Sequence, residues 1–242
     1  RDAGAERPEE RVQNLLLTIA GAIILAVAAA FAAPFVVDWS QWRSTFEAQA
    51  ARTLGAPVII RGPIDAQILP TPRVVLRDVS IGLDGGGTGI TVAELSGRLN
   101  LGALMRGEVV ADHIGLLRPR ARLVVDTTGK LSLPTGVTRP GGFSIAALSV
   151  TEGTFEILDR ANERTLKLDS VALTGEIGGP TGPVRLEGEA NAAGLRRRVR
   201  LNLTQFAADG TAKMRLGAQN VGSPLSVDAD GVLSLAGGAP SF

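Results

Sequence analysis

The sequence contains no cysteine and no tyrosine, and its single histidine is His113. Without thiols the chain can form neither disulfides nor thiolate metal sites. A lone histidine within VVADHIGLL is typical of a strand residue with a local hydrogen-bond partner, rather than of a metal ligand or a general base. Only 4% of the residues are aromatic although 45% are hydrophobic. The chain is therefore short of the large side chains that usually fill a compact core.

The sequence also lacks an excess of charge and any catalytic motif. The 25 basic and 24 acidic residues nearly cancel, so no global field attracts nucleic acid. The stretch DGGGTG at 84–89 lacks the ending of a phosphate-binding loop, and Asp78, Asp84 and Asp112 do not have the spacing of metal ligands. The stretch LRRRVR at 195–200 has no interleaved aromatic residues and is typical of a solvated strand face. We expect no enzyme activity, no cofactor, no metal and no nucleic-acid partner.

A long uncharged stretch is present near the start. Residues 12–37, which follow a charged flank at 1–11, include LLLTIAGAIILAVAAAFAAPFVV. About 20 apolar residues cross the roughly 30 Å of bilayer hydrocarbon, so a transmembrane helix is predicted, with Trp39 and Trp42 at the membrane interface. The alternative is a cleaved signal peptide ending near Ala30-Phe31-Ala32, which would leave a secreted soluble β protein. Either interpretation exports the rest of the chain.

Residues 38–56 predict a short amphipathic helix. Asp38 or Ser40 can cap its start, and Gly55 and Pro57 can end it. Its apolar positions recur at three- and four-residue spacing: Trp39, Trp42, Phe46, Ala50 and Leu54. This helix can lie on the membrane or pack beneath a sheet, and we favour packing.

Residues 57–242 alternate in the manner of antiparallel strands separated by turns. VIIRGPIDAQIL predicts a first strand pair broken at Gly62-Pro63, and Pro-Thr-Pro at 70–72 predicts the start of an edge strand. Hairpins are predicted over 121–133, 153–168 and 184–203, and turns at Asp209-Gly210 and Asp230-Gly231. A short helix is predicted around NLGALMRGE.

The predicted strands have one apolar face and one charged face, and little else in the sequence can cover the apolar one. We therefore expect a mainly β fold: a curved, elongated antiparallel sheet, forming an open groove or half-barrel with one or two short helices. The covering material could be a ligand, or the apolar residues could form an ordinary dry core. The candidate groove residues are Val75, Val79, Ile81, Leu123, Val125, Phe155, Ile157, Val199, Leu201 and Leu203.

Two stretches carry a resemblance to a known family: LGAPVIIRGPIDAQILPTPRVVLRDVSIG and ITVAELSGRLNLGALMRGEVVADHIGLLRPRARLVVDTTGKLSL. With the preceding apolar span, residues 15–133 resemble the N-terminal region of the AsmA family of Gram-negative envelope proteins. The resemblance implies a single-pass inner-membrane protein with a periplasmic β-rich body, which acts in outer-membrane homeostasis. It further implies phospholipid transfer along a hydrophobic groove, and a chain truncated at its C-terminal end. A non-catalytic scaffold that binds envelope proteins through sheet edges is the alternative.

Overall fold

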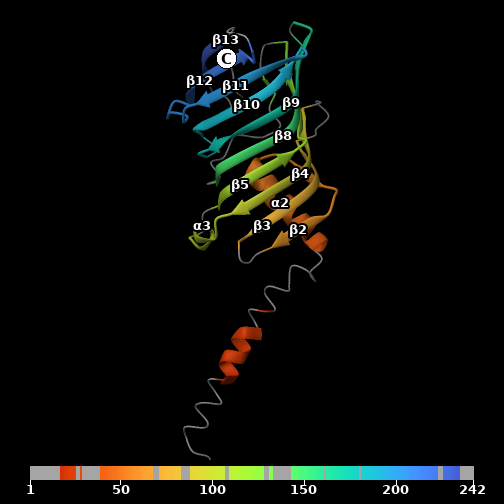
Figure 1. Cartoon of the computed structure of the whole chain (residues 1–242), viewed down its shortest axis with the longest axis vertical. Coiled ribbons are helices and arrows are strands. Elements are labelled where there is room, and N and C mark those ends of the chain that lie inside the picture. Colours follow the sequence, from red (N-terminus) through yellow and green to blue (C-terminus); the bar gives the residue numbers. More distant parts are fainter. Residues whose placement is uncertain are drawn as a thin grey trace, which may run out of the picture.

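The computed structural model describes residues 17–25, 28, 39–67, 71–82, 88–106, 109–127, 131–132, 143–160, 162–179, 181–222 and 226–234. The strands form a single large sheet (Figure 1). The elements are η1 (Trp39–Trp42), α2 (Arg43–Leu54), β1 (Val58–Ile60), β2 (Ile64–Gln67), β3 (Arg73–Ile81), β4 (Gly89–Leu99), α3 (Leu101–Met105), β5 (Val109–Leu117), β6 (Arg120–Val125), β7 (Leu131–Ser132), β8 (Phe143–Asp159), β9 (Arg164–Ile177), β10 (Val184–Ala192), β11 (Leu195–Leu203), β12 (Thr211–Asn220) and β13 (Ser226–Ser234).

The sheet follows the order β1-β3-β4-β5-β8-β9-β10-β11-β12-β13, with β2 beside β3 and β6 beside β4 and β8. Most neighbours are antiparallel, as predicted. The long strand β8 is different because it runs parallel to both β5 and β6. The sheet is therefore mixed: it is antiparallel except at these two pairs, where the predicted antiparallel arrangement does not hold. Parallel neighbours need a long connection, and local sequence patterns do not reveal which distant strands such a connection joins.

The predicted hairpins are confirmed in register. Phe155 lies opposite Leu168 in β8–β9, and Leu186 lies opposite Leu201 in β10–β11. The turn at Asp209-Gly210 joins β11 to β12. The turn predicted at Asp230-Gly231 is wrong, because β13 continues through both residues and pairs with β12 along its length.

The first strands differ from the prediction as well. β1 and β2 do not pair with each other; both pair with β3, on either side of the Gly62-Pro63 connection. β3 is therefore an interior strand and not an edge. Pro72 fits there because it precedes the first strand residue, so its missing N–H removes no ladder bond. Its carbonyl accepts the N–H of Leu99 at 2.9 Å.

A bend crosses the sheet at non-glycine residues with positive φ: Asp78 in β3, Arg118 between β5 and β6, Glu152 in β8 and Ser170 in β9. These positions are neighbours across the strands, since the Arg118 N–H bonds the Thr151 carbonyl at 2.8 Å. Such a residue kinks a strand and interrupts the alternation of its side chains. In Figure 1 the long strands β8 and β9 turn at one edge of the view.

The bend changes which residues of a strand lie on the same face of the sheet. Leu76 and Val79 lie three residues apart on either side of Asp78, yet both belong to one buried cluster. A Cβ added to Gly153 would lie 3.1 Å from Val150 and 3.3 Å from Phe155, which flank the bend in β8. We call the face that carries these apolar residues the inner face, and the opposite one the outer face.

The helix α2 packs on the inner face at the N-terminal end of the sheet, behind β3 to β5 in Figure 1. Phe46, Ala50 and Leu54 contact the cluster that contains Ile60 and Val79. Gly55 ends the helix in a left-handed conformation and donates to the Ala51 carbonyl. The prediction that this helix packs beneath the sheet is confirmed. α2 itself follows Trp42, which makes no side-chain cap bond, and the predicted cap Asp38 lies outside the described residues.

The predicted membrane span is only partly within the described residues. Residues 17–25 are helical and stand apart from the sheet (Figure 1). Over the described ranges, no helix combines the length and apolar character needed to cross a bilayer. Most of 12–37 lies outside these ranges, so the transmembrane helix stays a prediction.

Candidate functional site

The inner face of β8 to β13 is apolar along most of its cross-strand rows. Cross-strand partners place Leu186 of β10 beside Leu201 of β11, and Leu201 beside Leu216 of β12. The row continues to Ala229 of β13. Opposite residues in an antiparallel pair share a face, so each such row extends the apolar surface across the strands.

Of the ten candidate residues, Val79 and Ile81 lie in the dry core beneath α2, with Val79 only 1% exposed. They are covered by the chain's own side chains. Val75 is not on this face: it lies opposite Ser96 and Asp65, on the outer face. The simple alternation that grouped Val75 with Val79 is wrong because the bend at Asp78 lies between them.

Four further candidates lie on the inner face beyond the bend. Leu123 is opposite Ile157 in β6–β8, and Phe155 and Ile157 are opposite Leu168 and Leu166 in β8–β9. These side chains are half-buried, except Leu166, which is 51% exposed. Val125 continues the same row along β6 and is also half-buried.

The last three candidates are Val199, Leu201 and Leu203 of β11. They lie on the inner face, are half-buried, and align across β10 with the part of β9 that follows Ser170. Exposure then rises along the sheet: Leu216 of β12 is 42% exposed and Val227 of β13 is 61% exposed. In the part of the chain that the structure describes, no helix follows α3. No described helix therefore lies over the inner face of β9 to β13, although Val171, Ala190 and Ala212 on this face are buried.

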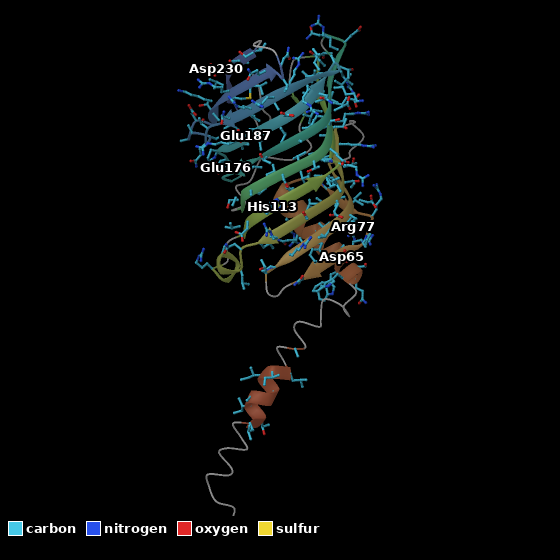
Figure 2. All side chains as sticks on the ribbon, in the orientation of Figure 1. Asp65, Arg77, His113, Glu176, Glu187 and Asp230 are labelled. Carbon is cyan, nitrogen blue, oxygen red and sulfur yellow. The ribbon has the colours of Figure 1, made fainter. Side chains whose placement is uncertain are left out.

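The outer face is charged and solvated. Cross-strand ion pairs join Arg185 to Glu176 at 2.6 Å and Arg215 to Asp230 at 2.7 Å. Figure 2 labels Glu176, Glu187 and Asp230 along this face. The hydrogen bond and the charge of Asp230 raise the pKa of Arg215. Hollows of about 310 and 390 Å³ on this face share Arg200 and Asn202 in their linings. A third hollow, of about 640 Å³, is lined by Thr204, Lys213, Arg215, Asp230 and Val232 among others.

The N-terminal part of the outer face has a second charge cluster. Arg77 bonds Asp65 at 2.8 Å and Glu94 at 3.2 Å (Figure 2 labels Arg77 and Asp65). These two hydrogen bonds raise the pKa of the Arg77 guanidinium.

His113 lies 3.1 Å from the Ser149 hydroxyl, which confirms the predicted local partner. Within the described residues, no three His, Asp or Glu side chains form a group that could hold a metal ion.

The two tryptophans have different surroundings. Trp39 packs against the core cluster beneath the sheet, and its indole Nε1 is buried without a described acceptor. Trp42 is 56% exposed. Of the two residues expected at the membrane interface, only Trp42 has a side chain free to reach it.

One inner-face residue was missed from the sequence. The run LRRRVR was interpreted as a charged strand face, but strict alternation from Val199 places Arg197 on the inner face. Its outer-face neighbours Arg196 and Arg198 both lie within 4 Å of Glu189. Counting residues back from Val199 would have revealed this charge within the apolar surface.

The comparison with known families agrees with this architecture. The sequence model of the AsmA family matches residues 10–140, which is more than half of the chain. The chain belongs to the AsmA family. No curated protein and no solved structure shows significant similarity to it.

Membership of the AsmA family indicates a bacterial envelope protein with an envelope-related function. The family match covers the predicted membrane-spanning residues, α2 and β1 to β7. The inner face of β9 to β13, over which the described residues place no helix, lies C-terminal to this match.

Proposed function

We propose that this AsmA-family protein is anchored in the bacterial inner membrane and carries phospholipid along the inner face of its periplasmic sheet. The observation that supports this most is the apolar surface of β9 to β13, over which the described residues place no helix. An acyl chain in water costs about 0.8 kcal/mol per exposed CH₂, and so on the order of 10 kcal/mol for a long chain. A continuous row of Leu and Val would remove much of that cost, and it needs no acid, base or metal.

The anchor is supported by the described helical residues 17–25. Leu17, Ile23 and Leu25 are each more than half exposed. Exposed large apolar side chains around a whole helix are typical of one that lies in lipid. Alkaline extraction of membranes tests the anchor: the full chain should stay in the pellet, whereas a chain lacking residues 12–37 should be released. Release of the full chain would contradict the proposal.

The lipid-carrying surface is tested with two matched substitutions. Leu216→Asp places a charge on the inner face, whereas Val232→Asp places one on the outer face, opposite Lys213. Both side chains are exposed, at 42% and 57%, so neither substitution disturbs a packed core. We expect Leu216→Asp to lower co-purified phospholipid at least fivefold, because a carboxylate in an apolar site costs several kcal/mol. Equal lipid content in both variants, measured by mass spectrometry, would contradict the proposal.

A scaffold that binds envelope proteins is the second candidate, and the two sheet edges bear on it. α2 covers the β1 edge, since Arg43 donates to the Ile60 carbonyl and Glu47 accepts the Ile60 N–H. The outer edge of β13 pairs with no described strand. Such an edge can add a strand from a partner. Protein that remains free of lipid after gentle extraction would favour the scaffold over lipid transfer.

A further inference from the structure

The inner face contains one charged side chain among its apolar rows on β10 and β11. Arg197 is opposite Ala190 of β10 and Asn220 of β12. Leu195 and Val199 are its inner-face neighbours along β11. The register of β10, β11 and β12 is continuous here, so no irregularity turns Arg197 toward the outer face.

The guanidinium of Arg197 lacks the carboxylate partners that most other arginines of these strands have. Arg185 and Arg215 each bond a carboxylate at less than 3 Å, and Arg198 lies 3.9 Å from Glu189. For Arg197, no ion pair or hydrogen bond with a described residue occurs. Its Nε is buried and has no acceptor within the described part of the chain. A buried N–H of a charged group without an acceptor is unfavourable, and an anionic acceptor at this position would relieve that cost.

The side chains around Arg197 are small or polar, and those of Ala190 and Ala192 are buried. The nearby inner-face positions Ala190, Ala192 and Ala218 are small. The Asn220 side chain supplies a second hydrogen-bonding group directly opposite Arg197. A guanidinium and an amide on one side of a site suit the oxygens of a phosphate, which accept several hydrogen bonds in a fork geometry.

The order of side chains along β11, charged near one end and apolar toward the other, suits an amphiphilic ligand. Leu195, beside Arg197, is 54% exposed near the β10–β11 turn, so the charged end of β11 is open to water. In the other direction Val199, Leu201 and Leu203 continue the inner face. At about 3.3 Å per residue, Arg197 to Leu203 spans roughly 20 Å. One leaflet of a bilayer has about half of the 30 Å of hydrocarbon, so an acyl chain fits along this distance.

We propose that Arg197, with Asn220, binds the phosphate of a phospholipid whose acyl chains lie over Val199, Leu201 and Leu203. This inference deepens the proposed function and rests on it: it assigns the residues that bind the phosphate of the lipid, and the direction in which the lipid lies. The charge of Arg197 selects an anionic phosphate over a neutral lipid of equal apolar area.

The test compares Arg197→Gln with Arg198→Gln in the full chain. Each protein is incubated with vesicles of phosphatidylglycerol, or with vesicles of neutral carrier lipid that contain diacylglycerol with the same acyl chains, and bound lipid is measured by mass spectrometry. We expect Arg197→Gln to lower bound phosphatidylglycerol about tenfold, the usual effect of losing a charge-assisted hydrogen bond. Diacylglycerol binding should not change. Arg198→Gln, on the outer face, should bind both lipids like the unaltered protein.

The outcomes separate this inference from the proposed function. If Arg197→Gln binds both lipids like the unaltered protein, Arg197 is not the headgroup site, although lipid binding stands. If the unaltered protein binds neither lipid, both proposals are wrong.

A second measurement does not depend on the stability of Arg197→Gln. A benzophenone placed at Asn220 should crosslink to the headgroup and glycerol region, and one at Leu203 to the acyl chain. The reverse pattern would overturn the assignment.

Discussion

Asp209, in the turn between β11 and β12, accepts hydrogen bonds from the Thr211 hydroxyl at 2.7 Å and the Thr211 N–H at 2.9 Å. These bonds, the hydroxyl first, hold the pKa of the Asp209 carboxyl below its usual range. A lowered pKa in the folded state stabilises the fold above the unfolded-state pKa. That contribution is lost as the pH falls through the folded value.

We predict that Thr211→Val raises the pKa of Asp209 toward its ordinary range, because the largest stabilising hydrogen bond is removed. Titration of the Asp209 carboxyl by NMR measures this directly. Thr165→Val, at an exposed position in β9, is the matched control and should leave the pKa of Asp209 unchanged. An unchanged pKa in Thr211→Val would show that the hydroxyl does not stabilise the carboxylate.

Glu152 has a φ of 55°, in the left-handed region, where the sheet bends. This region costs an L-residue roughly 1–2 kcal/mol, and β-branched side chains tolerate it worst. We predict that Glu152→Val lowers the free energy of unfolding by about 1–2 kcal/mol, whereas Glu152→Gly is tolerated to within ~1 kcal/mol.

The control for the bend is Thr151→Val at the preceding exposed strand position, which should change stability by less than about 0.5 kcal/mol. Urea denaturation provides all three values. If Glu152→Val is as stable as the unaltered protein, the left-handed conformation at Glu152 is not required for the bend.

The helix α2 is held to the β1 edge by side chains that bond the strand's backbone. Arg43 donates to the carbonyls of Ile60, Arg61 and Gly62, and Glu47 accepts the Ile60 N–H at 2.7 Å. These bonds satisfy an edge that would otherwise be open to strand pairing. The helix therefore both fills the inner face at this end and closes the sheet.

We predict that Glu47→Ala destabilises the protein by about 1–3 kcal/mol, because it leaves a partly buried backbone N–H without an acceptor. Hydrogen exchange at the Ile60 amide should become faster in this variant. Arg52→Ala, in the exposed last turn of the same helix, should change neither quantity measurably. Unchanged exchange at Ile60 in Glu47→Ala would contradict this role.

The sequence predicted the elements whose signals are local. The alternation around Phe155 and Leu186 predicted the hairpins, and Gly55 predicted the end of α2. Asn100 accepts the Ala103 N–H at 2.9 Å at the start of α3, where a short helix was also predicted. Each of these depends on residues close together in the chain, so that one sequence window contains the whole signal.

The remaining features depend on contacts between distant residues. The left-handed residues Asp78 and Glu152 have no glycine to mark them, so the bend was not predicted and Val75 was assigned to the wrong face. The Asp230-Gly231 turn was wrong because Asp230 pairs with Arg215, fifteen residues away, across a continuous strand. The parallel position of β8 likewise depends on pairing with β5 and β6 and not on its own alternation.

At the scale of the whole molecule, large apolar side chains of the inner face become more exposed toward β12 and β13, although the small Ala212 of β12 stays buried. Beneath α2 the inner face is a dry core, with Ile60 1% exposed. At β12 and β13 equivalent positions such as Leu216 and Val227 are exposed. The sequence left a dry core and a lipid-carrying surface as alternatives. The two describe different parts of one face: the dry core lies under α2, and we propose the lipid-carrying surface for β9 to β13.

The most direct test of this account is a photo-crosslinking scan along β11 and β12 in the full chain within membranes. Benzophenone is placed in turn at the inner positions Val199, Leu201 and Leu216, and at the outer positions Arg198, Arg200 and Arg215. We predict phospholipid adducts that alternate with the strand, strong at every inner position and near background at every outer one. Equal adducts on both faces, or none on the inner face of a folded protein, would contradict the claim that this surface carries lipid.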